Sequence, residues 1–429
     1  MKYNFFKSIS ILVLGAFITK VLGMLIKILI ARIIGTKGLG MYMLIFPTFM
    51  LLINLSNFSF PLALSKLISE EKRNTKKLFF SVLPIIIIIN IFLMIITFII
   101  SPYIGNNLLH NKDITISIKC MAFVIPFTSI SSVCRSYFFG KGKMLPHVIS
   151  NITEDLTRLL IIIIFLPKII PLGLKYTVMF LILINTISEF ISTITLILFI
   201  PKRINIKRND LIPKKSYIKD SLKICIPNTT SKLIASIGFF LEPIILTFYL
   251  LKNNYSHNYI TTEYGIISGY VIPLILLPSF ITLAISQALL PSISKDYVNN
   301  NINLIKKKIK YVIIISLLIA IPISIILEVY PNNLLKLIYN TSKGINYIRI
   351  LTPFCLLSYI ESPLQVVLDS INKSNINMYT MLISTITRSI SLIILSYLNI
   401  GIYSLIISII LNILITTIYQ IKKVRQCLT

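Results

Sequence analysis

The sequence is poor in charge and contains no tryptophan. Only 13% of its 429 residues are Asp, Glu, Lys or Arg, against about 25% in soluble domains. Hydrophobic residues make up 55% of the chain, and the mean hydropathy is +0.87. The longest hydrophilic stretch, residues 201–219, has 19 residues, whereas a folded soluble module needs about 50 or more. The sequence therefore has no room for a soluble catalytic domain, and its chemistry has to lie within the membrane.

Histidine and cysteine are scarce and scattered. No CxxC pair occurs, and no His lies within four residues of another His or a Cys, so neither a zinc site nor a haem site is indicated. The GxxxxGK[ST] pattern that cradles phosphate is missing as well. We expect no metal and no other cofactor. The residues concerned are Cys120, Cys134, Cys225, Cys355, Cys427, His110, His147 and His257.

Long apolar runs occupy most of the chain. About twelve of them are 18 to 30 residues long, and a membrane crossing takes about 20 residues. They predict an all-α polytopic membrane protein with about 12 transmembrane helices. The predicted spans are residues 10–33, 41–64, 78–100, 118–139, 148–165, 177–200, 221–250, 264–293, 312–330, 348–368, 378–398 and 402–419.

Positive charge is distributed unevenly between the two sides of the predicted membrane. The net charge is +28, and when residues near a span end are counted with the adjoining loop, 27 Lys and Arg lie on the side that holds both termini, 10 on the other side and five deep within spans. Positive loops stay in the cytoplasm, so we expect a cell-membrane protein with both termini cytoplasmic. The basic blocks at residues 202–208 and 306–310 would contact anionic lipid head groups. This distribution argues against nucleic acid as a partner.

The two halves of the chain share markers at nearly one offset. The markers are Pro47 and Pro273 (226), Pro126 and Pro353 (227), and Arg158 and Arg388 (230). A repeat of six spans gives both copies the same orientation, so the two should be related by a pseudo-two-fold axis along the membrane normal. The prediction is an N-terminal six-helix lobe at 1–200, a basic cytoplasmic linker at 201–220 and a C-terminal six-helix lobe at 221–429. The substrate path would lie between the lobes.

Charged residues inside the predicted spans are the candidate functional residues. A charge at the bilayer centre costs about 2.5 to 3.5 kcal/mol, so such residues face a cavity or a partner. The basic residues are candidates for binding an anionic substrate in a central cavity: Lys20, Lys27, Arg158, Lys232 and Arg388. The acidic residues are candidates for ion coupling or charge pairing: Glu154, Asp155, Glu189, Glu242 and Glu361.

Spacing along the helix distinguishes charged residues that lack a partner on their own span from those that have one. Lys20 and Lys27 are two helical turns apart and share one face of a span that has no acidic residue. They line a cavity or extend to the membrane interface. Glu154 and Arg158 have the spacing of an intrahelical ion pair, which is either structural or functional. The remaining glutamates are expected to pair with Arg388, Lys232 or the first-span lysines, in an order that the sequence does not assign.

Four segments closely resemble the stage V sporulation protein B family of polysaccharide exporters. They are residues 32–71, 135–159, 226–246 and 264–295, and the likeness extends over essentially the whole chain. The family belongs to the superfamily of lipid II flippases, O-antigen flippases and multidrug antiporters. The resemblance implies two six-helix lobes, alternating access and movement of an undecaprenyl-pyrophosphate-linked saccharide to the outer leaflet. Members commonly carry two further C-terminal spans, beyond the twelve predicted here.

Three function classes follow from these features. The first is a flippase for a lipid-linked saccharide, such as the peptidoglycan precursor of the spore cortex, with the substrate and anionic lipids as partners and no enzymatic activity. The second is a multidrug or cation antiporter of the same superfamily, with Glu242 or Glu189 as the ion-carrying carboxylate. The third is a polytopic glycan polymerase, which the lack of a sizeable outer loop with an acid–base constellation disfavours. The oligomeric state is not readable from the sequence.

Overall fold

The computed structural model describes residues 2–70, 75–200, 215–299, 301–371 and 373–428, and within these ranges the regular structure is entirely helical. The chain divides into two compact units, Met1–Ser236 and Ile237–Thr429. The first unit contains α1 (Lys2–Asn57), α2 (Phe60–Ser69), α3 (Thr75–Tyr103), α4 (Thr115–Gly140), α5 (Leu145–Ile169) and α6 (Leu174–Phe199). Helix α7 (Lys215–Lys252) contributes to both units.

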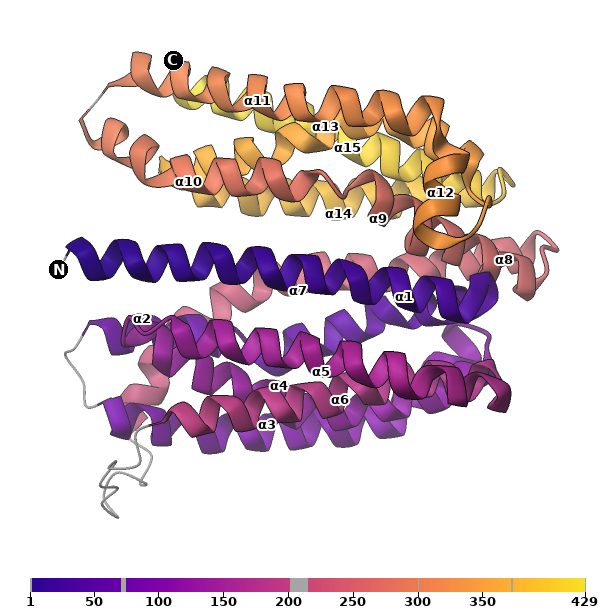
Figure 1. Cartoon of the computed structure of the whole chain (residues 1–429), viewed down its shortest axis with the longest axis horizontal. Helices are drawn as coiled ribbons and strands as arrows, with labels where there is room; N and C mark the ends of the chain where they lie inside the picture. The colour runs from indigo at the N-terminus through magenta and orange to yellow at the C-terminus, as the bar shows by residue number, and fades with distance from the viewer. Residues whose placement is uncertain (1, 71–74, 201–214, 300, 372, 429) are drawn as a thin grey trace. The chain divides into compact units, whose positions relative to one another are not determined.

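The second unit continues from the end of α7. It contains α8 (His257–Gly265), α9 (Ile272–Ile275), α10 (Ser279–Val298), α11 (Ile302–Val329), α12 (Pro331–Tyr339), α13 (Ile345–Ser370), α14 (Ser374–Tyr397) and α15 (Tyr403–Leu428), which are labelled in Figure 1. Two π-helical segments, Ile104–Leu108 and Ile266–Val271, follow α3 and α8.

The predicted spans are largely helical where the structure describes them. Nine helical stretches in the described residues are long and apolar enough to cross a membrane. One of them, Leu14–Ser69, is 56 residues long and holds the first two predicted spans. Helix α5 and the segment from α8 to α10 account for the fifth and eighth predicted spans, so the twelve-helix prediction agrees with the structure.

Two predicted spans are interrupted in the structure. Gly35 has φ 66° between the first two spans, and the second span breaks at Phe58 and Ser59, both with positive φ (41° and 49°). The eighth predicted span is not one helix, because it consists of α8, a π-helical segment, α9 and α10. Pro278 lies directly before α10 and has no backbone donor to continue the ladder from α9.

The boundary between the units differs from the predicted linker. Residues 201–214 of that linker lie outside the described residues, and α7 begins at Lys215. Cys225 on α7 packs in a buried cluster with Phe60, Leu64 and Val133 of the first unit. The first half of the predicted seventh span therefore packs with the N-terminal unit, and the boundary falls within α7 instead of before it.

The same packing order recurs in both units. In the first unit, α4 packs against α2, α3 and α6, while α5 packs against α6. In the second unit, α13 packs against α10, α11 and α15, while α14 packs against α15. This correspondence supports the six-helix repeat that the sequence markers predict.

A glycine allows the first helix of each unit to approach the fifth. A Cβ atom on Gly15 of α1 would lie 2.3 Å from Val148 of α5, and one on Gly238 of α7 would lie 2.3 Å from Thr385 of α14. Small residues at helix crossings are the usual way in which membrane helices pack closely. Both crossings lie on the helices that carry the marker arginines, Arg158 and Arg388.

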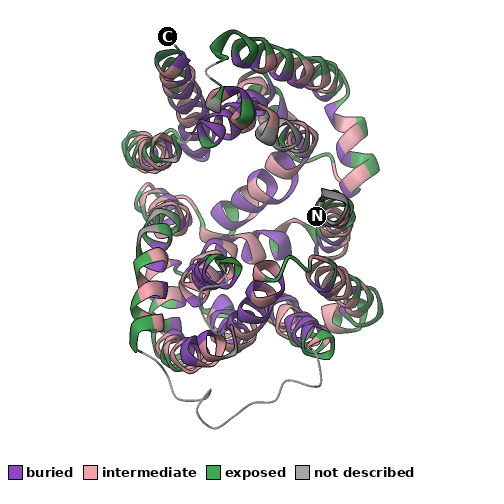
Figure 2. Ribbon diagram, turned by 90° about the vertical axis from the view of Figure 1, so that its left-hand side faces the viewer, coloured by how far each residue is buried: buried purple, intermediate pink, exposed green. Residues whose placement is uncertain are grey.

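Apolar side chains cover the outer faces of the helices. In the apolar window of α3, 17% of the residues are buried, which leaves a broad surface of isoleucine and phenylalanine for lipid. Figure 2 shows buried residues between the helices and exposed residues on their outer sides. Helix α4 is the opposite case, because its serines are largely buried against neighbouring helices.

Candidate functional site

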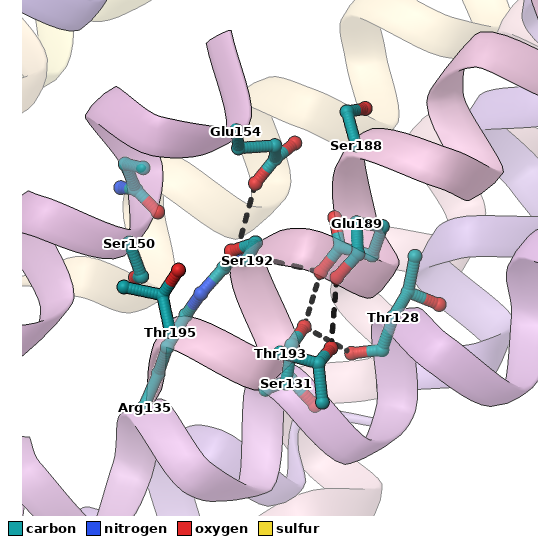
Figure 3. Close-up of polar contacts among 12 residues, drawn as sticks. Thr128, Ser131, Arg135, Ser150, Glu154, Ser188, Glu189, Ser192, Thr193 and Thr195 are labelled. Carbon is teal, nitrogen blue, oxygen red and sulfur yellow. Dashed lines mark hydrogen bonds and ion pairs between the residues drawn. The ribbon is translucent and has the colours of Figure 1, made fainter. Parts of the chain in front are cut away.

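Five charged side chains on three helices form one network in the first unit. Arg135 of α4 lies 3.0 Å from Glu154 of α5 and 3.3 Å from Glu189 of α6, all through Nη2. Arg158 contacts Glu154 at 2.7 Å and Asp155 at 3.1 Å. Glu154 therefore joins the two arginines, because each of its oxygens pairs with a different guanidinium (Figure 3 shows the Arg135 side).

Small hydroxyl side chains complete this network. Ser131, one turn before Arg135 on α4, donates to the same Glu189 oxygen that Arg135 approaches. Ser192 accepts from Arg135 at 2.9 Å, and Ser188 accepts from Arg158 at 3.4 Å. Serines allow α4, α5 and α6 to come close enough for these contacts. Buried charges in such a setting require both a counter-charge and hydrogen bonds.

The guanidinium groups are the more accessible part of the network. The side chains of Arg135 and Arg158 are 22% and 21% exposed, against 14% for Glu154 and Asp155 and 10% for Glu189. Nη1 of Arg135 makes no hydrogen bond to any described residue, since all its contacts run through Nη2. An anion that reached the network would meet free guanidinium donors before it met a carboxylate.

Arg135 is absent from the predicted set of charges inside the membrane. It lies within the predicted fourth span, close to its cytoplasmic end, and the tally of loop charges placed it on that side. The structure makes it the centre of the network and the partner of Glu189, which was expected to pair with Arg388, Lys232 or the first-span lysines. The signal was present in the sequence, because a serine-rich span with one arginine predicts a buried cation.

Lys20 and Lys27 remain apart from the network. Both lie on α1 with exposed side chains, and no described carboxylate lies within ion-pair distance of either. Lys232 of α7 is likewise exposed and unpaired among the described residues. These three predicted cations therefore have no carboxylate partner in the part of the chain that the structure describes.

In the second unit, Arg388 and Glu242 pair with each other. Arg388 Nε lies 2.5 Å from Glu242 Oε2, and the Glu242 side chain is 3% exposed. Tyr264 donates to the other Glu242 oxygen at 3.3 Å. This is one of the predicted pairings. Glu242, one of the two candidate ion-carrying carboxylates of an antiporter, is therefore already paired with a cation of the chain itself, Arg388.

Glu361 of α13 differs from the other buried glutamates. Its Oε1 accepts from Thr416 at 2.7 Å and Thr417 at 2.9 Å, both on α15. No lysine or arginine in the described ranges pairs with it, so it was wrong to expect a cationic partner here. Across the same ranges no group of three or more His, Cys, Asp or Glu side chains has a geometry that could hold a metal ion.

One of the two basic blocks is described. Lys306, Lys307 and Lys310 are exposed on the first turns of α11, as head-group contacts require, while Lys308 pairs with Asp296 of α10. The block at residues 202–208 lies outside the described residues.

Comparison with known proteins identifies the family. Residues 5–297 match the family described as polysaccharide biosynthesis protein. The chain belongs to this family. A second match, to the MatE family, covers residues 267–398.

Two curated proteins of Bacillus subtilis (strain 168) are similar to the chain. The chain is 28% identical to stage V sporulation protein B over 398 residues, which is 90% of this chain and 77% of that protein. It is 20% identical to the lipid II flippase MurJ, over 90% of this chain and 76% of the flippase.

Solved structures share the fold. An inward-facing MATE family multidrug transporter of the MOP superfamily aligns with a TM-score of 0.78 at 16% identity, covering 96% of this chain and 94% of the transporter. The inward-closed lipid II flippase MurJ aligns with a TM-score of 0.72 at 17% identity, covering 96% and 87%. The chain is therefore a multi-pass membrane protein with the fold of these transporters.

Proposed function

We propose that this protein moves a saccharide linked to undecaprenyl pyrophosphate, the peptidoglycan precursor used for the spore cortex, from the cytoplasmic to the outer leaflet of the cell membrane. Both termini lie in the cytoplasm, and transport proceeds by alternating access without enzymatic chemistry. The similarity to stage V sporulation protein B and to the lipid II flippase supports this substrate class.

The observation that carries the proposal is the pair of unneutralised lysines on α1. Lys20 and Lys27 share one face of the helix, both are exposed, and neither pairs with a described carboxylate. A cation inside a membrane needs an anionic partner, and a pyrophosphate group supplies one. Lysine would hold it as a point charge.

The network on α4 to α6 offers a second positively charged group, Arg135, to the pyrophosphate. Arg135 keeps Nη1 free while its Nη2 donates to Glu154, Glu189 and Ser192. A guanidinium fixed in this way is preorganised, and its planar donors suit phosphate oxygens. In the proposed cycle, the lysines attract the pyrophosphate and Arg135 orients it.

A leaflet-accessibility assay of undecaprenyl-linked sugars tests the function. Cells depleted of the protein should accumulate substrate in the inner leaflet, and the wild-type chain should reverse this. Lys20→Ala should abolish the reversal although the variant accumulates in the membrane, while Lys20→Arg retains part of it. Lys223→Ala, an exposed lysine near the start of α7, is the control and should act as wild type. Full activity of Lys20→Ala would remove Lys20 from the site.

A multidrug or cation antiporter is the second candidate, and Glu361 is the observation that favours it. Its carboxylate is held by two hydroxyl groups and no described cation, an oxygen-rich setting that suits sodium or a proton. In this case, efflux of a cationic dye driven by a sodium or pH gradient should depend on Glu361 and be lost in Glu361→Gln. Dye efflux equal in the wild type and in empty membranes would leave the flippase as the function.

A further inference from the structure

Four tyrosines and one glutamate gather at one end of the second unit. Tyr255 and Tyr259 stack with ring centroids 5.5 Å apart and an interplanar angle of 21°. Tyr347 and Tyr403 meet edge to face at 5.7 Å. Tyr347 donates a hydrogen bond of 2.6 Å to Glu263, whose second oxygen accepts nothing from the described residues. We call these five residues the tyrosine cluster.

The cluster is built on a rigid frame. Tyr255 lies in the turn before α8, Tyr259 and Glu263 lie on α8, and Tyr347 and Tyr403 lie at the starts of α13 and α15. Ser256 caps α8 by accepting from the backbone of Tyr259, and Asn253 ties the end of α7 to Ser396 of α14. A Cβ on Gly401 would lie 3.0 Å from the Tyr255 hydroxyl, so the loop before α15 closes on that ring. The rings are thus held before any ligand arrives.

Two rings of the cluster keep open surface. Tyr259 and Tyr403 are each 38% exposed, whereas Tyr255 and Tyr347 are half-buried behind them. Burial raises the pKa of Tyr259, and Glu263, Tyr255 and Tyr403 raise it further. Its phenol therefore stays protonated and can donate at neutral pH. Open aromatic faces beside a free carboxylate oxygen and a phenol donor combine apolar contact with a few placed polar groups, as small-molecule sites do.

This end of the unit lies away from the basic end. Within the second unit, α8 and α12 lie at the end opposite the C-terminus (Figure 1). The exposed Lys306, Lys307 and Lys310 begin α11 at the other end. By the positive-inside rule, the tyrosine cluster lies on the non-cytoplasmic side, where a flipped substrate would arrive.

We propose that the tyrosine cluster binds the saccharide portion of the transported lipid as it reaches the outer leaflet. Pyranose rings present C–H faces that pack on aromatic rings, and their hydroxyls would donate to Glu263 and accept from Tyr259. The inference rests on the proposed function for the identity of the saccharide. Tyrosines that only anchor a membrane interface would face lipid singly, whereas these rings face one another around a carboxylate.

Binding of a soluble sugar to the purified full-length protein tests the proposal. The probe is N,N′-diacetylchitobiose, followed by saturation-transfer NMR, with sorbitol as the comparison polyol. The wild type should bind the disaccharide and not sorbitol. Tyr259→Leu with Tyr403→Leu should weaken binding about tenfold or more, the loss expected for one to two aromatic contacts. Tyr259→Phe with Tyr403→Phe should keep most of the affinity, and Glu263→Gln should lower it.

Matched controls separate the cluster from a general effect of tyrosine. Tyr311 and Tyr330 are 62% and 57% exposed and have no ring partner among the described residues. Their replacement by leucine should leave sugar binding unchanged. An undecaprenyl-pyrophosphate-linked disaccharide should displace the chitobiose from the wild type. Absence of chitobiose binding, or an equal loss in the control variant, would overturn the proposal.

The experiments can disprove saccharide binding by the tyrosine cluster without disproving the flippase function, and the reverse. If the wild type binds no sugar while the leaflet assay still shows transport, the tyrosine cluster is an interface anchor and the flippase function stands. If sugar binds but cells show no dependence of lipid-linked saccharide on the protein, the flippase function falls and the cluster serves a free saccharide. Thermal melting of each variant checks that it is folded.

Discussion

Asp155 and Glu154 bind the same arginine, but among the described residues Glu154 alone of the two also binds a second one. Glu154 is held by both Arg158 and Arg135, whereas Arg158 is the one ion-pair partner of Asp155 among the described residues. Asp155 and Arg158 therefore form the pair that can be removed with least effect on the rest of the network. This makes them the better choice for asking whether Arg158 is structural or contacts substrate.

Arg158→Gln should lower the free energy of unfolding by about 3 kcal/mol, because it leaves the partly buried Asp155 without its cation and removes one of the two cations of Glu154. Adding Asp155→Asn should restore much of that stability. If Arg158 contacts the substrate, the double variant should be stable and inactive in the leaflet assay. Lys308→Gln with Asp296→Asn, a pair that joins α10 to the first turns of α11, is the matched control and should be stable and active. Activity restored in the Arg158 and Asp155 double variant would make Arg158 a structural residue.

Sequence reasoning reached most of the charged residues and two of their pairings, but it missed Arg135 and the partners of Glu189 and Glu361. The spacing of Glu154 and Arg158 is local, so their contact follows from helix geometry. The Arg135–Glu189 contact joins helices 54 residues apart in sequence, and depends on how closely the serines allow α4 and α6 to pack. Hydropathy carries no information about that distance. The hydrogen bonds of Glu361 to Thr416 and Thr417 were not predicted for the same reason.

At the scale of the helix, glycine sets the distance between α1 and α5. Gly15→Ala would normally favour a helix, yet its Cβ would lie 2.3 Å from Val148, a stiff β-branched side chain. We expect it to destabilise the protein by about 1 to 3 kcal/mol through overpacking. Gly23 lies on the same helix with nothing within 4 Å of a Cβ, so Gly23→Ala should stabilise by up to about 1 kcal/mol. Thermal melting of purified variants measures both, and equal stability of the two would contradict the close crossing.

Helices were predicted better than their interruptions. Apolar length alone gives twelve helical spans, since a membrane crossing demands about 20 residues whatever the partners are. The break before α10 in the eighth span has a local cause in Pro278, whereas the positive φ values of Phe58 and Ser59 are not what their residue types favour. Neither Phe58 nor Ser59 is a residue type that prefers a positive φ, so no local pattern indicates the break.

At the scale of the whole molecule, topology follows from the positive charges. A reporter inserted at residue 208 and one fused after Thr429 should both read as cytoplasmic. One inserted at Asn254, in the turn between α7 and α8, should read as external. A cytoplasmic signal at Asn254 would place the tyrosine cluster on the wrong side of the membrane for a receiving site. Expression level of each fusion is the control.

The pairing of Arg388 with Glu242 bears on whether Glu242 needs an ion from solution. This guanidinium is a cation that is covalently part of the chain, so it is present at every sodium concentration. Glu242 therefore has a counter-charge within the chain and needs neither a bound sodium ion nor a proton to balance it. A dependence of transport on either would have to originate at a carboxylate without such a tether, and Glu361 is one.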